Sequence, residues 1–81
     1  MPHIIVQCPV LTRAQRAAAV AEITDAFSRA TGIEAANVVV HVQEHSYDEI
    51  GVGGRLLSDL YPELREKERR VREQRGASPS A

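Results

Sequence analysis

The sequence has few of the residues that mark secreted, metal-binding or membrane-spanning proteins. Its single cysteine, Cys8, excludes an internal disulfide framework and favours a reducing compartment. Its three histidines show none of the close spacings typical of zinc sites, so no metal site is predicted. No apolar run approaches the length of a membrane span, and no charged-then-apolar leader precedes a cleavage site. We therefore expect a cytoplasmic protein that does not act at a membrane.

Aromatic residues are also scarce, at 4% of the 81 residues with no tryptophan. The core must be built from alanine, valine, isoleucine and leucine, which together give little bulk. A chain this short buries only about 60–65% of the surface that its unfolded form exposes, so a monomer is marginal. Association with further copies of the chain is the expected supplement.

Charge is unevenly divided along the chain. Residues 1–61 carry four arginines and seven acidic residues, a net charge of −3, whereas residues 62–81 carry six basic and four acidic residues. A net negative body argues against a nucleic-acid-binding surface, which needs clustered basic charge. The change in composition predicts a domain over residues 1–61 and a charged helical extension over 62–81, with a disordered end from residue 76.

The domain itself reads as strand, helix, strand. Residues 3–8 and 38–44 are rich in isoleucine and valine on both faces, as in strands covered on both sides. Thr12 and Gln15 have the spacing of a capping box, and Gly32 is placed to end the helix. The stripe expected to be buried consists of Ala19, Val20, Ile23, Ala26, Phe27 and Ala30. The order predicts an α/β (α+β) fold with two parallel strands packed on one long helix.

The segments after the second strand are shorter and more polar. Residues 50–55 contain three glycines and predict a small hairpin or bulged turn, followed by a short strand or helical turn over 56–60. The glycines lack the context of a phosphate-binding loop, and no cofactor is expected. A helix is predicted from Pro62, stabilised by oppositely charged side chains at four-residue spacing. Because it has few apolar residues to bury, we expect it to be mobile or to pack on a neighbouring subunit. The pairs expected are Glu63–Lys67, Glu66–Arg70 and Glu68–Arg72.

The start of the chain carries the main candidate for chemistry. Met1 before a small residue such as Pro2 is normally removed, which leaves Pro2 as a secondary amine at the start of a strand. An α-amino group has a reference pKa of about 8, and apolar surroundings lower it by disfavouring the cation. A base with a pKa near 7 is suited to proton transfer at carbon. Pro2 is therefore the candidate catalytic residue.

These features together resemble the tautomerase superfamily, specifically its short 4-oxalocrotonate tautomerase-like group. The resemblance rests on the Met1-Pro2 start, the Thr-x-x-Gln-capped helix, and the strand at 38–44 followed by Gly-Val-Gly-Gly at 51–54. It covers residues 2 to about 60. It implies a cofactor-independent isomerase that moves a proton on a small enolisable or unsaturated carbonyl compound resembling a 2-oxo acid. It also implies a homohexamer, with a dimer or trimer as the alternative.

Carried over by position, the resemblance gives a partial site. Pro2 matches the catalytic proline, and Ile50 and Val52 match apolar pocket residues that a neighbouring subunit supplies. The two arginines that bind substrate in the best-known members are replaced here by Leu11 and Val39.

Other donors must then stabilise the enolate oxygen, because charge developing in a dry pocket is costly. We expect Arg13 and Arg55 to do so ahead of His41, which shares a strand face with the pocket position Val39.

Two other functions stay open. In the first, a protonated Pro2 supports dehalogenation, hydration or decarboxylation, and a carboxylate such as Glu44, Asp48 or Glu49 activates water. In the second, the protein is a catalytically silent oligomer that binds a ligand through the same pocket.

Overall fold

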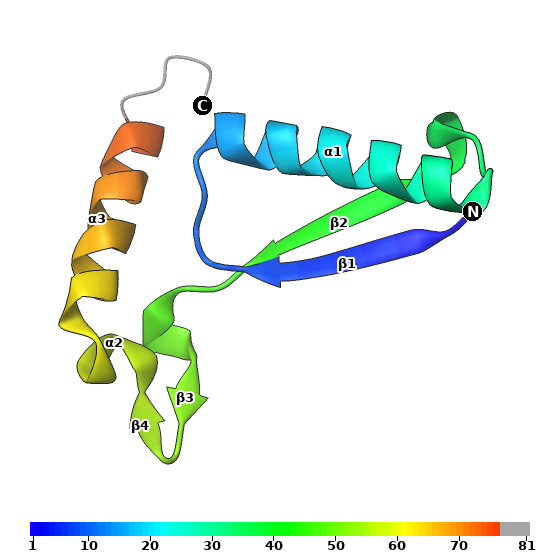
Figure 1. Cartoon of the computed structure of the whole chain (residues 1–81). Helices are drawn as coiled ribbons and strands as arrows, with labels where there is room; N and C mark the ends of the chain where they lie inside the picture. The colour runs from blue at the N-terminus through cyan, green and yellow to red at the C-terminus, as the bar shows by residue number, and fades with distance from the viewer. Residues whose placement is uncertain (77–81) are drawn as a thin grey trace.

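Two parallel strands and one long helix form the body of the computed structural model, which describes residues 1–76 (Figure 1). Strand β1 (His3–Cys8) is followed by helix α1 (Arg13–Thr31), the 3-10 turn η1 (Ala35–Asn37) and strand β2 (Val39–Glu44). The strands pair in parallel, with His3 opposite Val39 and Cys8 opposite Glu44. The predicted strand–helix–strand fold is confirmed. Most of the predicted disordered end lies outside the described residues.

Helix α1 begins and ends where local chemistry requires. The Thr12 hydroxyl accepts a hydrogen bond from the Gln15 backbone N–H at 3.1 Å, and the Gln15 side chain accepts from the Thr12 N–H at 2.9 Å. This is the predicted capping box, which satisfies two N–H groups that the first turn cannot pair. At the other end Gly32 adopts φ 77° and donates to the Ser28 carbonyl, because a left-handed residue closes the last turn.

The helix covers one face of the sheet. Along β1 the half-buried residues Ile4, Val6 and Cys8 alternate with exposed ones, and Ile5 is 58% exposed. The expectation of a strand covered on both faces is therefore not met within a single chain. On α1, the expected stripe is half-buried except for Ala26 and Ala30, which are exposed.

A hairpin and two helices complete the described chain. Strands β3 (Gly51–Val52) and β4 (Arg55–Leu56) pair antiparallel, as the glycine-rich segment predicts. Gly53 and Gly54 form the turn, with φ of 60° and 85°. Tight hairpin turns require such positive φ angles, which residues with a Cβ atom rarely adopt. The segment after it is the short helix α2 (Leu57–Leu60), followed by α3 (Pro62–Gly76). No helix of the described chain is long and apolar enough to span a membrane.

Helix α3 is held against the body by a buried carboxylate. Glu68 is 9% exposed and accepts hydrogen bonds from the Ser46 hydroxyl and the Tyr47 backbone N–H, both at 2.8 Å. The predicted pairing of Glu68 with Arg72 is present at 3.2 Å. A buried side chain thus anchors α3 to its own chain, a contact that the sequence did not predict.

The surface charge pairs of α3 differ from those predicted. Arg69 pairs with both Glu66 and Glu73. Glu66 therefore pairs with Arg69, three residues away, whereas the predicted partner was Arg70, four residues away. Spacings of three and four residues both place side chains on the same helix face, so the sequence alone does not select between them.

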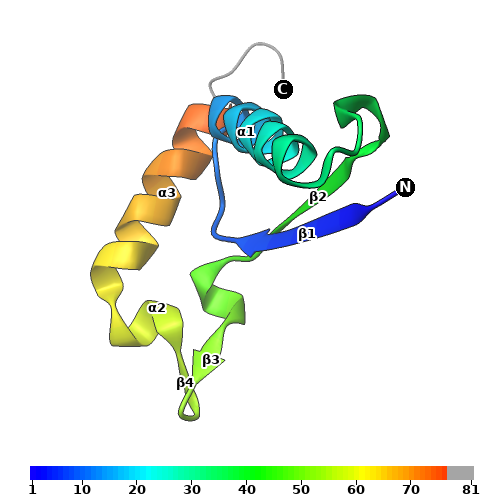
Figure 2. The same cartoon turned by 45° about the vertical axis from the view of Figure 1, so that its right-hand side comes forward.

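The described chain is flat and open. Its principal extents are 43 × 37 × 15 Å and its radius of gyration is 15.4 Å, against about 12 Å for a compact domain of this length. The two views show α3 and the β3–β4 hairpin extending away from the layer formed by α1 and the sheet (Figures 1 and 2). Val10 is the only apolar residue among residues 1–75 that is classed as buried. The thin core expected from composition is thus confirmed.

Candidate active site

Pro2 lies at the entrance to the sheet, directly before β1. Its ring is half-buried, and its carbonyl accepts a hydrogen bond from the Val39 N–H at 3.0 Å, so its backbone is fixed to the start of β2. Met1 is 82% exposed and adds little packing. Removal of Met1 would therefore leave the Pro2 position unchanged and expose its nitrogen as an amine.

The structure brings Val39 and His41 to the same region as Pro2. Val39 is half-buried opposite His3, and His41 lies two residues further along the same face of β2. Nδ1 of His3 lies 2.9 Å from Nε2 of His41, and the two rings stack with centroids 5.2 Å apart and an interplanar angle of 18°. One nitrogen of His41 is thus already engaged by His3. This contact was not predicted from the sequence. The parallel pairing of the two strands could have indicated it, because it places both histidines on the same face of the sheet.

The hairpin residues lie far from Pro2 in the same chain. Ile50 is half-buried before β3, whereas Val52 is 55% exposed and Arg55 is exposed on β4. Both views place the chain start and the hairpin at opposite ends of the molecule (Figures 1 and 2). A site that combines Pro2 with Ile50, Val52 or Arg55 therefore needs a second copy of the chain.

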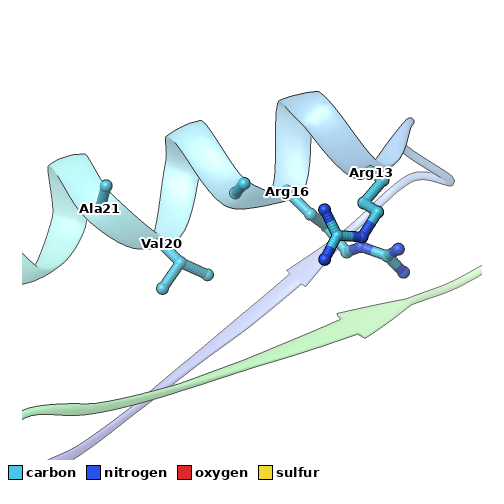
Figure 3. Close-up of a pocket in the computed structure, with 5 residues that line it drawn as sticks. Arg13, Arg16, Val20 and Ala21 are labelled. Atoms are coloured by element: carbon cyan, nitrogen blue, oxygen red, sulfur yellow. The ribbon is translucent and has the colours of Figure 1, made fainter. Parts of the chain in front are cut away.

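Arg13 lies at the start of α1, at the other end of the sheet from Pro2. With Arg16 it lines an open pocket of about 460 Å³ on the flank of the helix (Figure 3). The remaining lining residues are Ala17, Val20 and Ala21. The pocket therefore combines two guanidinium groups with an otherwise aliphatic wall.

Glu44 joins the end of β2 to the start of α1 and the end of α3. One of its carboxylate oxygens accepts from the Leu11 N–H at 3.0 Å, and the other accepts from the Arg75 guanidinium at 2.9 Å. Arg16 approaches the first of these oxygens at 3.6 Å. This cluster could not be predicted from the sequence, because the fold brings together residues separated by about thirty positions.

Cys8 has the environment of a packing residue. Burial raises the pKa of its thiol, and the nearby Glu44 carboxylate raises the pKa further, with Arg16 opposing in part. A thiol with a raised pKa forms little of the nucleophilic thiolate. Cys8 therefore acts as a small hydrophobic residue rather than as a nucleophile.

The described residues contain no group of three or more histidine, cysteine, aspartate or glutamate side chains arranged to hold a metal ion. Of the carboxylates considered for activating water, Glu44 has the partners given above, and Asp48 pairs with Arg65 at 3.6 Å. The Ser58 hydroxyl, followed by smaller contributions that include Arg65, lowers the pKa of Asp48. Both carboxylates already have partners in the chain.

Comparison with solved structures agrees with this architecture. The crystal structure of YwhB, a homologue of 4-oxalocrotonate tautomerase, is 30% identical and aligns with a TM-score of 0.66, covering 72% of this chain and 97% of that chain. DmpI from Helicobacter pylori shares the fold, with 19% identity and a TM-score of 0.64 over 72% of this chain and 98% of that chain. No curated protein matches the chain significantly. The model of the tautomerase enzyme family matches residues 2–60, and this chain therefore belongs to the tautomerase family.

Proposed function

We propose that the protein is a cofactor-independent tautomerase in which Pro2, freed by removal of Met1, is the general base and acid. The observation that carries the proposal is the position of Pro2. It is half-buried at the start of β1, behind an exposed Met1, in a chain of the tautomerase family. The substrate proposed is a small enolisable or unsaturated carbonyl compound resembling a 2-oxo acid.

The chemistry follows from the nature of the nitrogen. A neutral secondary amine removes a proton from the carbon next to a carbonyl, and the resulting ammonium returns the proton to another carbon of the conjugated system. Apolar surroundings favour the neutral amine that the first step needs. The enolate oxygen formed between the two steps requires a cation or hydrogen-bond donor in the site.

The donors proposed for this oxygen are Arg13 and Arg55, ahead of His41. Arg13 is the first residue of α1 and Arg55 is on β4. The start of α1 and the hairpin both lie away from the chain start in Figures 1 and 2, so either arginine would reach the site from a neighbouring copy. The same holds for Ile50 and Val52 as pocket walls. A homo-oligomer, with a hexamer favoured over a dimer or trimer, is therefore part of the proposed function.

The test combines mass spectrometry with kinetics. The intact mass of the purified protein should lack one methionine, and the protein should tautomerise phenylenolpyruvate or 2-hydroxymuconate. Pro2→Ala should abolish this activity, whereas Pro9→Ala, a matched change at an exposed proline, should retain it. Activity that persists in Pro2→Ala would reject Pro2 as the base.

The hydrolytic alternatives receive less support from the geometry. They need a carboxylate free to activate water, and Glu44 and Asp48 are already paired, which leaves only Glu49 of the three carboxylates considered. Release of halide or carbon dioxide from suitable substrates would nevertheless favour them over isomerisation. A protein with a confirmed free Pro2 amine and no turnover would instead be a ligand-binding oligomer.

A further inference from the structure

Two histidine side chains meet on the exposed face of the sheet. Nδ1 of His3, on β1, lies 2.9 Å from Nε2 of His41, on β2. Both residues are exposed in the chain, so solvent reaches the pair. Thirty-eight positions separate the two residues, and the parallel pairing of the strands is what brings their side chains together. A site built in this way gives no signal in the spacing of histidines along the sequence.

The separation of the two nitrogens suits two ligands of one metal ion. A histidine nitrogen binds Zn²⁺ at about 2.0–2.1 Å. Two such bonds at right angles place the nitrogens about 2.9 Å apart, and two bonds at the tetrahedral angle place them about 3.3 Å apart. The observed 2.9 Å therefore needs to open by about 0.4 Å at most for tetrahedral coordination. Small rotations of two exposed rings provide this.

The hydrogen bond between the rings does not prevent metal binding. One of the two facing nitrogens carries a proton and the other accepts it, so the ion must displace that proton. A neutral imidazole can carry its proton on either nitrogen, and the proton can therefore move to the outer nitrogen of the same ring. Both rings then stay neutral and both facing nitrogens have a free lone pair, which is the form of histidine that binds metal ions.

No charged side chain of β1 or β2 shares this face with the two histidines. Strand alternation and the observed pairing place these residues on it: His3, Ile5, Gln7, Val39, His41 and Gln43. No arginine or lysine of the strands repels a cation there, and no carboxylate of the strands competes as an oxygen ligand. Imidazole ligands suit transition-metal ions such as Zn²⁺, Ni²⁺ and Cu²⁺, whereas Mg²⁺ and Ca²⁺ prefer oxygen.

We propose that His3 and His41 together bind one divalent transition-metal ion, such as Zn²⁺, on the open face of the sheet. The two imidazoles are the ligands from the chain, and water fills the remaining positions. An ion held there links β1 to β2, and its binding free energy adds to the stability of the folded chain. The binding does not rest on the proposed function, in which His41 ranks behind two arginines as a donor.

The test is a calorimetric titration of ZnCl₂ into the full-length protein after treatment with a chelator and its removal. Saturable binding of one ion per chain is expected. His3→Gln and His41→Gln should each weaken binding by at least about tenfold, because one of the two metal–nitrogen bonds is lost. His45→Gln, which removes the remaining histidine of the sequence, is the matched control and should keep the affinity. No saturable binding, or equal losses in all three variants, would overturn the inference.

Thermal unfolding provides a second readout that does not depend on how stable each variant is at the start. ZnCl₂ should raise the unfolding midpoint of the unmodified protein and of His45→Gln, but not that of His3→Gln or His41→Gln. Cys8 is the other side chain with a strong preference for Zn²⁺, and it lies half-buried on the opposite face of β1. Cys8→Ser should therefore respond to ZnCl₂ as the unmodified protein does, and loss of the response would overturn the inference.

Two further outcomes would also reject the site. MgCl₂ that binds as tightly as ZnCl₂ would indicate oxygen ligands instead of the two imidazoles. If a second copy of the chain covers the histidine pair in the assembled protein, ZnCl₂ will not bind, and the pair is then only the cross-strand hydrogen bond that links β1 and β2.

Discussion

His3 and His41 form a hydrogen bond across the two parallel strands, with Nδ1 of His3 2.9 Å from Nε2 of His41. Thirty-eight positions separate them in the chain. The register pairs His3 with Val39 and Ile5 with His41, so the two histidines are diagonal neighbours on the exposed face of the sheet. The imidazole that carries the proton donates and the other accepts, so the contact links the strands beyond their backbone pairing.

This contact predicts an energetic coupling between the two histidines. His3→Ala and His41→Ala should each lower the free energy of unfolding by about 0.5–1 kcal/mol, as expected for an exposed cross-strand pair. The double variant should lose less than the sum of the two, because the second change removes a contact already broken. Chemical denaturation measures all three values, and strict additivity would contradict the contact.

Docking of α3 should weaken at low pH. Burial raises the pKa of Glu68, but hydrogen bonds from the Tyr47 N–H, the Ser46 hydroxyl and Arg72 together outweigh it, so the pKa is lowered overall. A lowered pKa in the folded state stabilises the fold above the unfolded value of about 4.3, and this stabilisation is lost as the pH falls through the folded pKa. The protection of α3 amides against hydrogen exchange, relative to the intrinsic exchange rate at the same pH, should therefore fall below about pH 4.

Glu68→Gln is the matched variant for this prediction. It should lose α3 protection already at neutral pH, because an amide is a weaker acceptor for Arg72 and for the Tyr47 N–H. Its remaining protection should depend less on pH between about 3 and 6 than that of the unmodified protein. An identical pH profile in both proteins would show that another group controls docking.

The thiol of Cys8 should react slowly. Because burial and the Glu44 carboxylate raise its pKa, less thiolate is present at any pH below that value. Alkylation by iodoacetamide at pH 8 should be about tenfold slower or more than for the same protein unfolded in denaturant, where the reference pKa is about 8.5. Equal rates in the folded and unfolded protein would show that the thiol is freely accessible.

The capping box at the start of α1 should contribute measurably to stability. Thr12→Ala removes the acceptor for the Gln15 N–H and should cost about 1 kcal/mol, within the usual range of about 0.5–2 kcal/mol. Thr12→Ser keeps the hydroxyl and should restore most of this loss. Thermal unfolding at fixed protein concentration provides the comparison, and equal losses for Ala and Ser would argue against the cap.

The parts of the fold that could be predicted from the sequence depend on neighbouring residues. The capping box, the glycine at the end of α1, and the glycine turn of the hairpin are local patterns with a direct backbone cause. The parallel pairing follows from the order of strand, helix and strand. These predictions needed no knowledge of distant contacts, and the structure confirms them.

The contacts that could not be predicted join distant segments. The residues next to Glu68 in the chain do not indicate that its carboxylate will accept hydrogen bonds from Ser46 and Tyr47. Likewise, the residues near Glu44 do not indicate its ion pair with Arg75. The candidate site shows the same limit. Pro2 and Val39 lie together as strand pairing requires, whereas Arg13 and Arg55 lie elsewhere in the chain and stay predictions for an assembly.

The flatness of the molecule has a thermodynamic consequence. The layer is 15 Å thick, and Val10 is its only buried apolar residue within residues 1–75, so much hydrophobic surface is left for contact with other molecules. If those molecules are further copies of itself, folding and association become one equilibrium governed by mass action. Dilution alone would then lower the midpoint of thermal unfolding, with no change in pH, salt or sequence.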